Sequence, residues 1–171
     1  MTRYARAILV AAVCITMGLA SHAPAAAQDA ASLTDFTRTI EAGDIDLSLV
    51  HLNNVTVPIL FEPPTLYVIR AQAAETTLLY VQGTATVESE LDTTGFSIEQ
   101  DGTSMAAKPI NVKYFEGGTV TVPGGERVDG ILAFEGSVDL SRPFTVMHGG
   151  NAVEFRLSEE AVAQLTTPAA Q

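Results

Sequence analysis

The sequence predicts an all-β protein that folds as a two-sheet antiparallel sandwich of the immunoglobulin type. Apolar and polar side chains alternate with a period of two from Asp44 onward, as they do in half-buried strands. Turn pairs that contain glycine follow one another at short intervals, and no long helical pattern separates the predicted strands. We therefore expect helix only in a cleaved N-terminal signal helix and in short helical turns at both ends of the mature chain.

The first 27 residues have the features of a secretory signal peptide. Arg3 and Arg6 supply positive charge, an apolar run follows over residues 7–20, and residues 25–27 are the small alanines that signal peptidase requires. The apolar run is shorter than the roughly 20 residues that span a bilayer. We expect cleavage after Ala27, no stable membrane anchor after processing, and export to the periplasm or the extracellular medium.

The predicted mature chain, residues 28–171, is strongly acidic and contains no thiol. Of the 9 Lys and Arg residues, Arg3 and Arg6 are removed, which leaves 7 basic against 20 acidic residues and a net charge of −13. Nucleic acid and anionic lipid headgroups are poor partners for such a surface. The only cysteine, Cys14, lies in the signal region, so we expect no disulfide and no cysteine-ligated metal.

Residues 28–43 form an N-terminal segment with two interpretations. Ser32 and Asp35 fit a capping pair for one short helix, which Gly43 can end. Thr34, Thr37 and neighbouring threonines suit an extended segment equally well.

Residues 44–165 are predicted to form the β-sandwich domain. The first half contains strands at residues 45–49, 55–61, 66–71, 76–82 and 84–90. The second half contains strands at residues 110–115, 119–122, 128–134, 144–148 and 152–157. Pro58 lacks a backbone donor, so the strand at 55–61 is expected at a sheet edge or at a bulge. A capped helical turn is predicted at 158–165 and a flexible tail at 166–171.

The segment from Phe96 to Leu157 resembles the telokin-like immunoglobulin-type β-sandwich domains of secreted bacterial proteins. The matching features are an Asp-Gly turn, a Pro-Gly-Gly turn and a Gly-x-x-x-Phe strand: Asp101-Gly102, Pro123-Gly124-Gly125, Gly130 and Phe134. This resemblance implies a sandwich fold and an accessory role outside the cytoplasm, and it implies no catalytic residue.

No assembled chemical motif is found in the sequence, so we expect no catalytic residue, no metal site and no cofactor. Calcium is the metal that the sequence fits best, because Asp44 with Asp46 and Glu99 with Asp101 place carboxylates two residues apart, but the EF-hand series is absent. His51 and His148 are interpreted as structural or solvated residues. For ligand binding, the candidate residues near turns are His148, Asn151 and Asp101.

Three functions follow from these observations, in order of preference. The first is a non-enzymatic exported domain that binds a protein or peptide in the cell envelope or outside. Residues 55–61 are then a sheet edge that either accepts a strand from another chain or is kept from such pairing by Pro58. The second is a carrier of a small apolar ligand, built as a barrel whose inside is lined by the alternating residues. The third is a hydrolase or metal-dependent enzyme that uses His148 with acids near Asp101 or Asp129.

Overall fold

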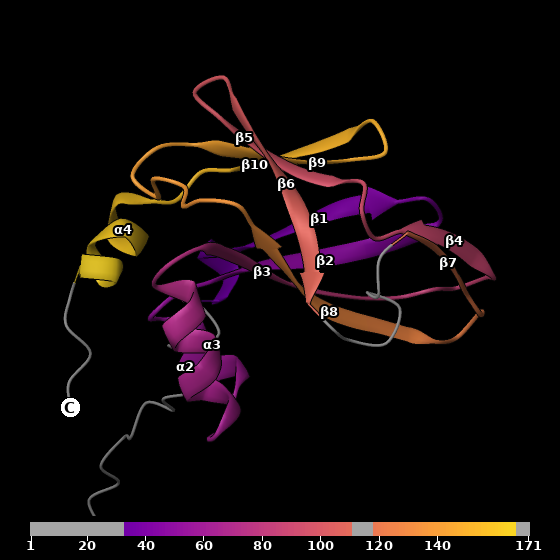
Figure 1. The fold of residues 1–171 in the computed structure, drawn as a ribbon, viewed down its shortest axis with the longest axis horizontal. Coiled ribbons are helices and arrows are strands. Elements are labelled where there is room, and N and C mark those ends of the chain that lie inside the picture. The colour runs from indigo at the N-terminus through magenta and orange to yellow at the C-terminus, as the bar shows by residue number, and fades with distance from the viewer. Residues whose placement is uncertain (1–32, 111–117, 167–171) are drawn as a thin grey trace, which may run out of the picture.

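Eight antiparallel strands form one strongly curved sheet in the computed structural model, which describes residues 33–110 and 118–166 (Figure 1). The order across the sheet is β1-β2-β3-β8-β6-β5-β9-β10. The bounds are β1 Thr37–Ala42, β2 Ile45–Leu52, β3 Thr77–Thr84, β5 Phe96–Gln100, β6 Thr103–Ile110, β8 Arg127–Phe134, β9 Phe144–His148 and β10 Asn151–Phe155. A small second sheet pairs β4 (Ser89–Asp92) with β7 (Thr119–Val122).

The first and last strands of the large sheet, β1 and β10, lie next to each other, so the sheet is nearly closed into a barrel. Among the described strands, no backbone ladder joins β1 to β10. Side chains bridge the seam between these two strands instead. Arg38 on β1 donates from Nε to the Glu154 carbonyl oxygen at 3.2 Å and from Nη2 to that of Arg156 at 2.8 Å. Asn151 on β10 donates from Nδ2 to the Glu41 carbonyl oxygen at 3.0 Å.

This closure corrects the predicted fold. The protein is all-β in the main, but the two-sheet immunoglobulin-type sandwich is wrong. Alternating inward and outward side chains are common to sandwich sheets and to barrels, because both bury one face of every strand. The alternation therefore does not tell whether the first and last strands meet.

Large apolar side chains fill the inside of the barrel. Its buried cluster includes four phenylalanines from four different strands: Phe96, Phe134, Phe144 and Phe155. The rings of Phe144 and Phe155 are stacked with centroids 4.8 Å apart. Leu91 of β4 and Val122 of β7 are fully buried in the same cluster, so the small sheet contributes to this core as well.

Two helices cover part of the outer face of the barrel. Short α2 (Val57–Leu60) and α3 (Thr65–Ala73) pack beside β2, β3 and β8 (Figure 1). Leu52, Leu78 and Ile131 point outward from these strands and join Val57 and Ile69 in a second apolar cluster. The strand β3 is therefore buried on both faces, which explains why it is a nearly continuous apolar run.

The predicted strands at 55–61 and 66–71 are wrong, because these residues form α2 and α3. Pro58 lies in the first turn of α2. A backbone N–H at this place has no intrahelical partner, so a proline there removes no hydrogen bond of the helix. In α3, Leu66, Ile69 and Ala73 recur at intervals of three and four residues and face the second apolar cluster, which is the spacing of a helix.

Several other expectations are confirmed or corrected by the described residues. Of the N-terminal segment, residues 33–35 form a helical turn and Thr37–Ala42 form β1, so the predicted helix does not continue to Gly43 and the extended interpretation holds from Thr37. Helix α4 (Glu159–Thr166) confirms the C-terminal helical turn, and Ser158 Oγ accepts a hydrogen bond from the Ala161 N–H at 3.1 Å. The predicted turn at Asp101 and Gly102 is present, with positive φ at both residues.

The signal peptide, most of the strand predicted at 110–115, and residues 167–171 of the tail lie outside the described residues. No helix in the described ranges is long and apolar enough to cross a membrane.

Candidate functional site

A pocket of about 300 Å³ lies at one end of the barrel, where four segments converge. These segments are the end of β2, the C-terminal end of α3, the loop after β8, and α4. The lining residues are His51, Leu52, Asn53, Asn54, Arg70, Ala73, Ala74, Thr76, Thr77, Ser137, Val138, Leu140 and Leu165. Its volume is at the lower limit of sites that bind small molecules.

His51 is the buried polar residue of this site. It follows Ile45, Leu47 and Leu49 in the inward row of β2, where the pattern of the strand places an apolar side chain. The residue is only 5 % exposed, and its ring meets the Phe144 ring edge-on with centroids 6.0 Å apart. Burial lowers the pKa of His51 to about 4, so the imidazole is neutral at pH 7.

Asn53 determines which nitrogen of His51 carries the proton. Its side-chain Oδ1 accepts from the backbone N–H groups of Val55 at 2.8 Å and Thr56 at 3.1 Å, which fixes the orientation of the amide. The amide nitrogen Nδ2 then faces His51 Nδ1 at 3.3 Å. Because Nδ2 is a donor, Nδ1 must be the acceptor, and the proton of the neutral ring is on Nε2.

Most other polar side chains of the lining already have protein partners. Thr77 Oγ1 accepts from the Val138 N–H at 2.9 Å, and Thr76 Oγ1 donates to the Phe134 carbonyl oxygen. Ser137 Oγ donates to the carbonyl oxygen of Glu75 at 3.3 Å, and Asn54 Nδ2 donates to that of Leu165 at 3.1 Å. These bonds position the loop after β8 and the end of α4 around the pocket.

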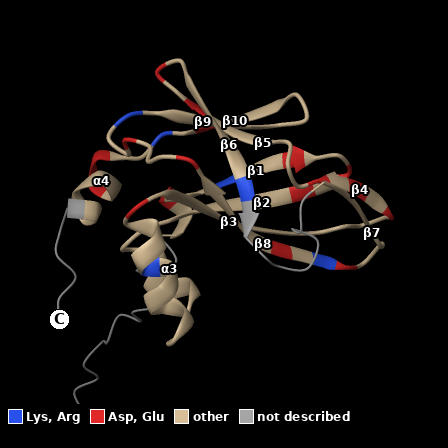
Figure 2. Ribbon diagram, viewed as in Figure 1, with Lys and Arg blue, Asp and Glu red and all other residues tan. Residues whose placement is uncertain are grey.

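Two nitrogen donors of the lining, His51 Nε2–H and the guanidinium of Arg70, form no hydrogen bond to another described residue. Among the described residues, the hydrogen bonds of the His51 side chain engage Nδ1, and the ion pairs engage Lys108, Arg142 and Arg156. Arg70 is the one basic residue of α3, a helix with no acidic residue (Figure 2). No aspartate or glutamate is among the described residues that line the pocket.

The three ligand-binding candidates of the sequence analysis lie outside this pocket. His148 is buried at the end of β9, where its Nε2 bonds the Asp92 carbonyl oxygen at 2.7 Å and its ring lies 4.2 Å from that of Phe96. Its Nδ1 is buried without a partner among the described residues. Asn151 is exposed on β10, bridges the seam, and borders a shallow groove of about 240 Å³ there.

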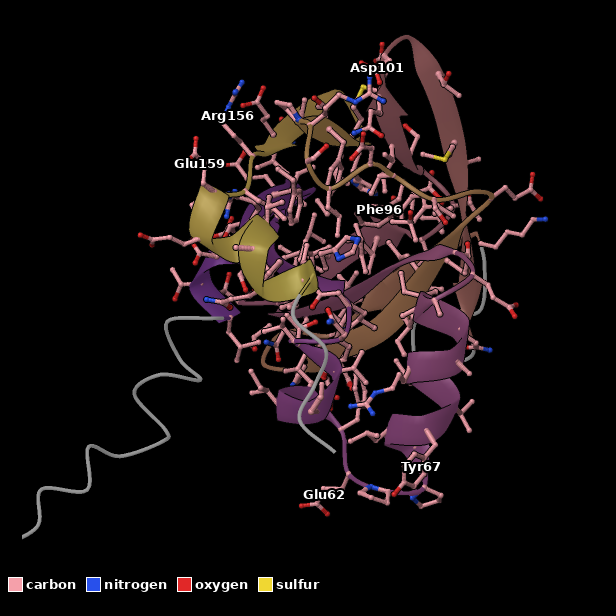
Figure 3. The ribbon with its side chains drawn as sticks, turned by 90° about the vertical axis from the view of Figure 1, so that its left-hand side faces the viewer. Glu62, Tyr67, Phe96, Asp101, Arg156 and Glu159 are labelled. Carbon is pink, nitrogen blue, oxygen red and sulfur yellow. The ribbon has the colours of Figure 1, made fainter. Side chains whose placement is uncertain are left out.

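Asp101 lies far from both of these residues. It is exposed at the tip of the β5–β6 hairpin and forms an ion pair with Arg142 at 2.7 Å (Figure 3). His148 is opposite Phe96 in the pairing of β5 with β9, five residues from Asp101 along β5, or about 17 Å of strand. Asp129, the other acid considered with His148, is opposite Gln82 on β3. The structure does not bring these acids and His148 together.

Metal ligands do not gather in the described ranges: no group of three or more His, Cys, Asp or Glu side chains could hold an ion there. The two carboxylate pairs considered for calcium belong to different parts of the sheet. Asp44 and Asp46 belong to the β1–β2 hairpin, and Glu99 lies on β5.

Sequence reasoning missed the pocket because its lining comes from segments that are distant along the chain. It interpreted His51 as structural or solvated, without recognising that its ring lines a pocket. One local signal was present: Asn53 and Thr56 form a turn directly after a strand, in which Thr56 Oγ1 donates to the His51 carbonyl oxygen at 2.7 Å. The second apolar face of β2 and β3 was a further sign that a helix covers this side.

Comparison with known proteins gives little further information. No family model and no curated protein matches the sequence. A protein of unknown function from Burkholderia pseudomallei K96243 is 13% identical, with a TM-score of 0.44, over 82% of this chain and 86% of its own. A functionally unknown protein from Listeria monocytogenes EGD-e is 14% identical, with a TM-score of 0.36, over 72% of this chain and 82% of its own. Likenesses at these TM-scores carry no argument about function.

Proposed function

We propose that the protein binds a small, mostly apolar molecule in the pocket at the end of the barrel and acts as a carrier of that molecule. The observation that supports this most is the composition of the pocket. Its wall combines apolar side chains with one buried neutral imidazole, whose Nε2–H is not engaged by another described side chain. Small-molecule sites typically have such a wall, with few polar groups that orient the ligand.

The place of the ligand differs from that expected for a barrel carrier. From the sequence we expect an apolar ligand inside the barrel, but the phenylalanines and leucines of the core fill that space. The ligand therefore binds at the barrel end, against His51 and the C-terminal end of α3. A volume of 300 Å³ equals that of about ten water molecules, which corresponds to a ligand of roughly ten non-hydrogen atoms.

The function preferred from the sequence, binding of a protein or peptide, depended on an exposed strand at residues 55–61 that the structure does not contain. Residues 55–61 are not an unpaired strand, and Leu60 and Phe61 pack against the outer apolar cluster of the barrel. Binding of an envelope or extracellular protein stays a prediction without an identified surface. Export also stays a prediction, and the carrier proposed here would work in the periplasm or outside the cell.

The proposal is tested by blocking the pocket from α3. Ala74 lines the pocket and is exposed at the C-terminal end of α3, so Ala74→Trp adds an indole there without changing the core. The matched control is Ala71→Trp, an exposed position of the same helix outside the lining. The probes are the neutral ligands octan-1-ol and methyl octanoate, followed by ¹H–¹⁵N NMR titration of the purified protein.

We expect both probes to shift the amide signals of Thr76, Thr77 and Ser137 in the wild type and in Ala71→Trp, and not in Ala74→Trp. Native mass spectrometry of freshly purified protein is the complementary measurement, since a bound species would add its mass. Absence of titratable shifts in the wild type, or shifts that persist in Ala74→Trp, would contradict a carrier that uses this pocket.

A further inference from the structure

We propose that the ligand of this pocket carries a carboxylate, which Arg70 and the Nε2–H of His51 bind together. This inference rests on the proposed function and adds the chemical class of the ligand. The polar head group of the ligand would lie at the Arg70 side of the pocket, and its apolar chain would lie along the remaining wall.

Charge is the first argument. The whole chain contains 20 acidic and 9 basic residues, yet the described lining has one arginine and no acidic residue. Glu75, the acid nearest to Arg70 along the chain, is exposed and is not part of the lining. An anionic ligand would be attracted to this end of an otherwise acidic molecule, and an ammonium group would meet the like charge of Arg70 without a compensating carboxylate.

Hydrogen bonding is the second argument. The hydroxyl donors of Thr76 and Ser137 and the amide donor of Asn54 already bond carbonyl oxygens of the protein. Thr77 Oγ1 is bonded as an acceptor from the Val138 N–H. The nitrogen donors without a bond to another described residue are those of His51 and Arg70, so the pocket offers a ligand N–H groups from a neutral ring and from a cation. A carboxylate accepts several such bonds, and bonds to ionised groups are about twice as strong as neutral ones.

The apolar wall is the third argument. Leu52 of β2, Val138 and Leu140 of the loop after β8, and Leu165 of α4 contribute aliphatic side chains from three segments. A medium-length acyl chain fits this lining and the volume of about 300 Å³, since octanoate has ten non-hydrogen atoms.

The test compares four ligands that share one chain length and differ in the head group: octanoate, methyl octanoate, octan-1-ol and octylamine. Binding to the purified protein is measured at pH 7 by isothermal titration calorimetry and, for weak ligands, by NMR titration. We expect octanoate to bind about tenfold or more tightly than the ester and the alcohol, and octylamine to bind most weakly.

Two arginine variants assign the preference to this site. Arg70→Leu is expected to reduce the affinity for octanoate to that for methyl octanoate and to leave the ester affinity within about twofold. The control is Arg156→Leu, which removes an exposed arginine that pairs with Glu154 on β10, and it should retain the full preference. Both positions are exposed, so neither substitution is expected to unfold the protein.

The outcomes separate this inference from the proposed function. Equal binding of octanoate, ester and alcohol in the pocket would overturn the carboxylate assignment and leave the carrier function standing. A preference for octanoate that survives Arg70→Leu would overturn it too. Failure of all four ligands to bind would contradict the carrier function itself.

Discussion

The two histidines of the described chain are both buried, yet their surroundings give them different roles. His148 bonds a backbone carbonyl and packs with a tilted ring against Phe96, so its environment is that of a structural residue. His51 lines the pocket and has its Nδ1 bonded by Asn53, while its Nε2 makes no hydrogen bond to another described side chain. From the sequence these residues could not be distinguished, because the distinction depends on Asn53 and on segments that only the fold brings together.

Burial of neutral His51 predicts a pH dependence of stability. Its pKa is about 4 in the folded protein and 6.5 in the unfolded chain, so the unfolded state binds more protons between these values. The stabilisation is therefore fully present above pH 6.5 and is lost as the pH falls towards 4. We expect the free energy of unfolding to decrease by about 2 kcal/mol between pH 7 and pH 5.

Urea denaturation of the wild type and of His51→Gln across this range measures the effect. The glutamine side chain replaces the imidazole with a polar amide that does not titrate, so the variant should lose little stability between pH 7 and pH 5 even if it is less stable throughout. The carboxyl groups with lowered pKa, Asp92, Glu135 and Asp139, titrate below this range. Parallel curves for the two proteins would show that His51 is not the titrating group.

At the scale of the elements, the seam between β1 and β10 is held by side chains in place of a backbone ladder. The Arg38 guanidinium donates to carbonyls on both sides of the seam, including that of Thr37 on β1 at 2.6 Å and that of Arg156 just after β10 at 2.8 Å. It also lies over the Phe155 ring, 5.4 Å from its centroid. The planar guanidinium makes these contacts at once, and a lysine ammonium does not have the same geometry.

Loss of this arginine should loosen the seam. We expect Arg38→Ala to lower the free energy of unfolding by about 2 kcal/mol and Arg38→Lys to recover only part of it. Hydrogen exchange of the β1 and β10 amides should become faster, while the β3 amides stay protected. Arg127→Ala is the control, because exposed Arg127 bonds the Gln82 side chain within the β3–β8 ladder and should cost less than about 0.5 kcal/mol. Equal effects of the two alanine variants would contradict a special role of Arg38.

Prediction from the sequence succeeded for the elements that local patterns determine. Strands such as β2, β8 and β9, and turns such as Asp101-Gly102, follow from alternation and from glycine positions. It failed at α2 and α3, where Val, Ile and Phe favoured strands although Pro58 is compatible with a first helical turn. It also assigned no strand to β5, which is only five residues long and buries alternate positions.

At the scale of the whole molecule, the arrangement of the strands was beyond local reasoning. Closure of the barrel requires β1 to meet β10, which are separated by most of the chain, and a period of two does not encode that meeting. The pocket is a consequence of the same arrangement. With the barrel interior filled, the pocket proposed for the ligand lies at the barrel end, between the strands and the helices α3 and α4.

The most direct test of this account is a crystal structure of the protein with bound octanoate. The account predicts density for the ligand at the end of the barrel, with its head group in contact with Arg70 and His51 Nε2 and its chain against Leu140 and Leu165. Density inside the barrel, in the groove along the β1–β10 seam, or nowhere at saturating octanoate would contradict it.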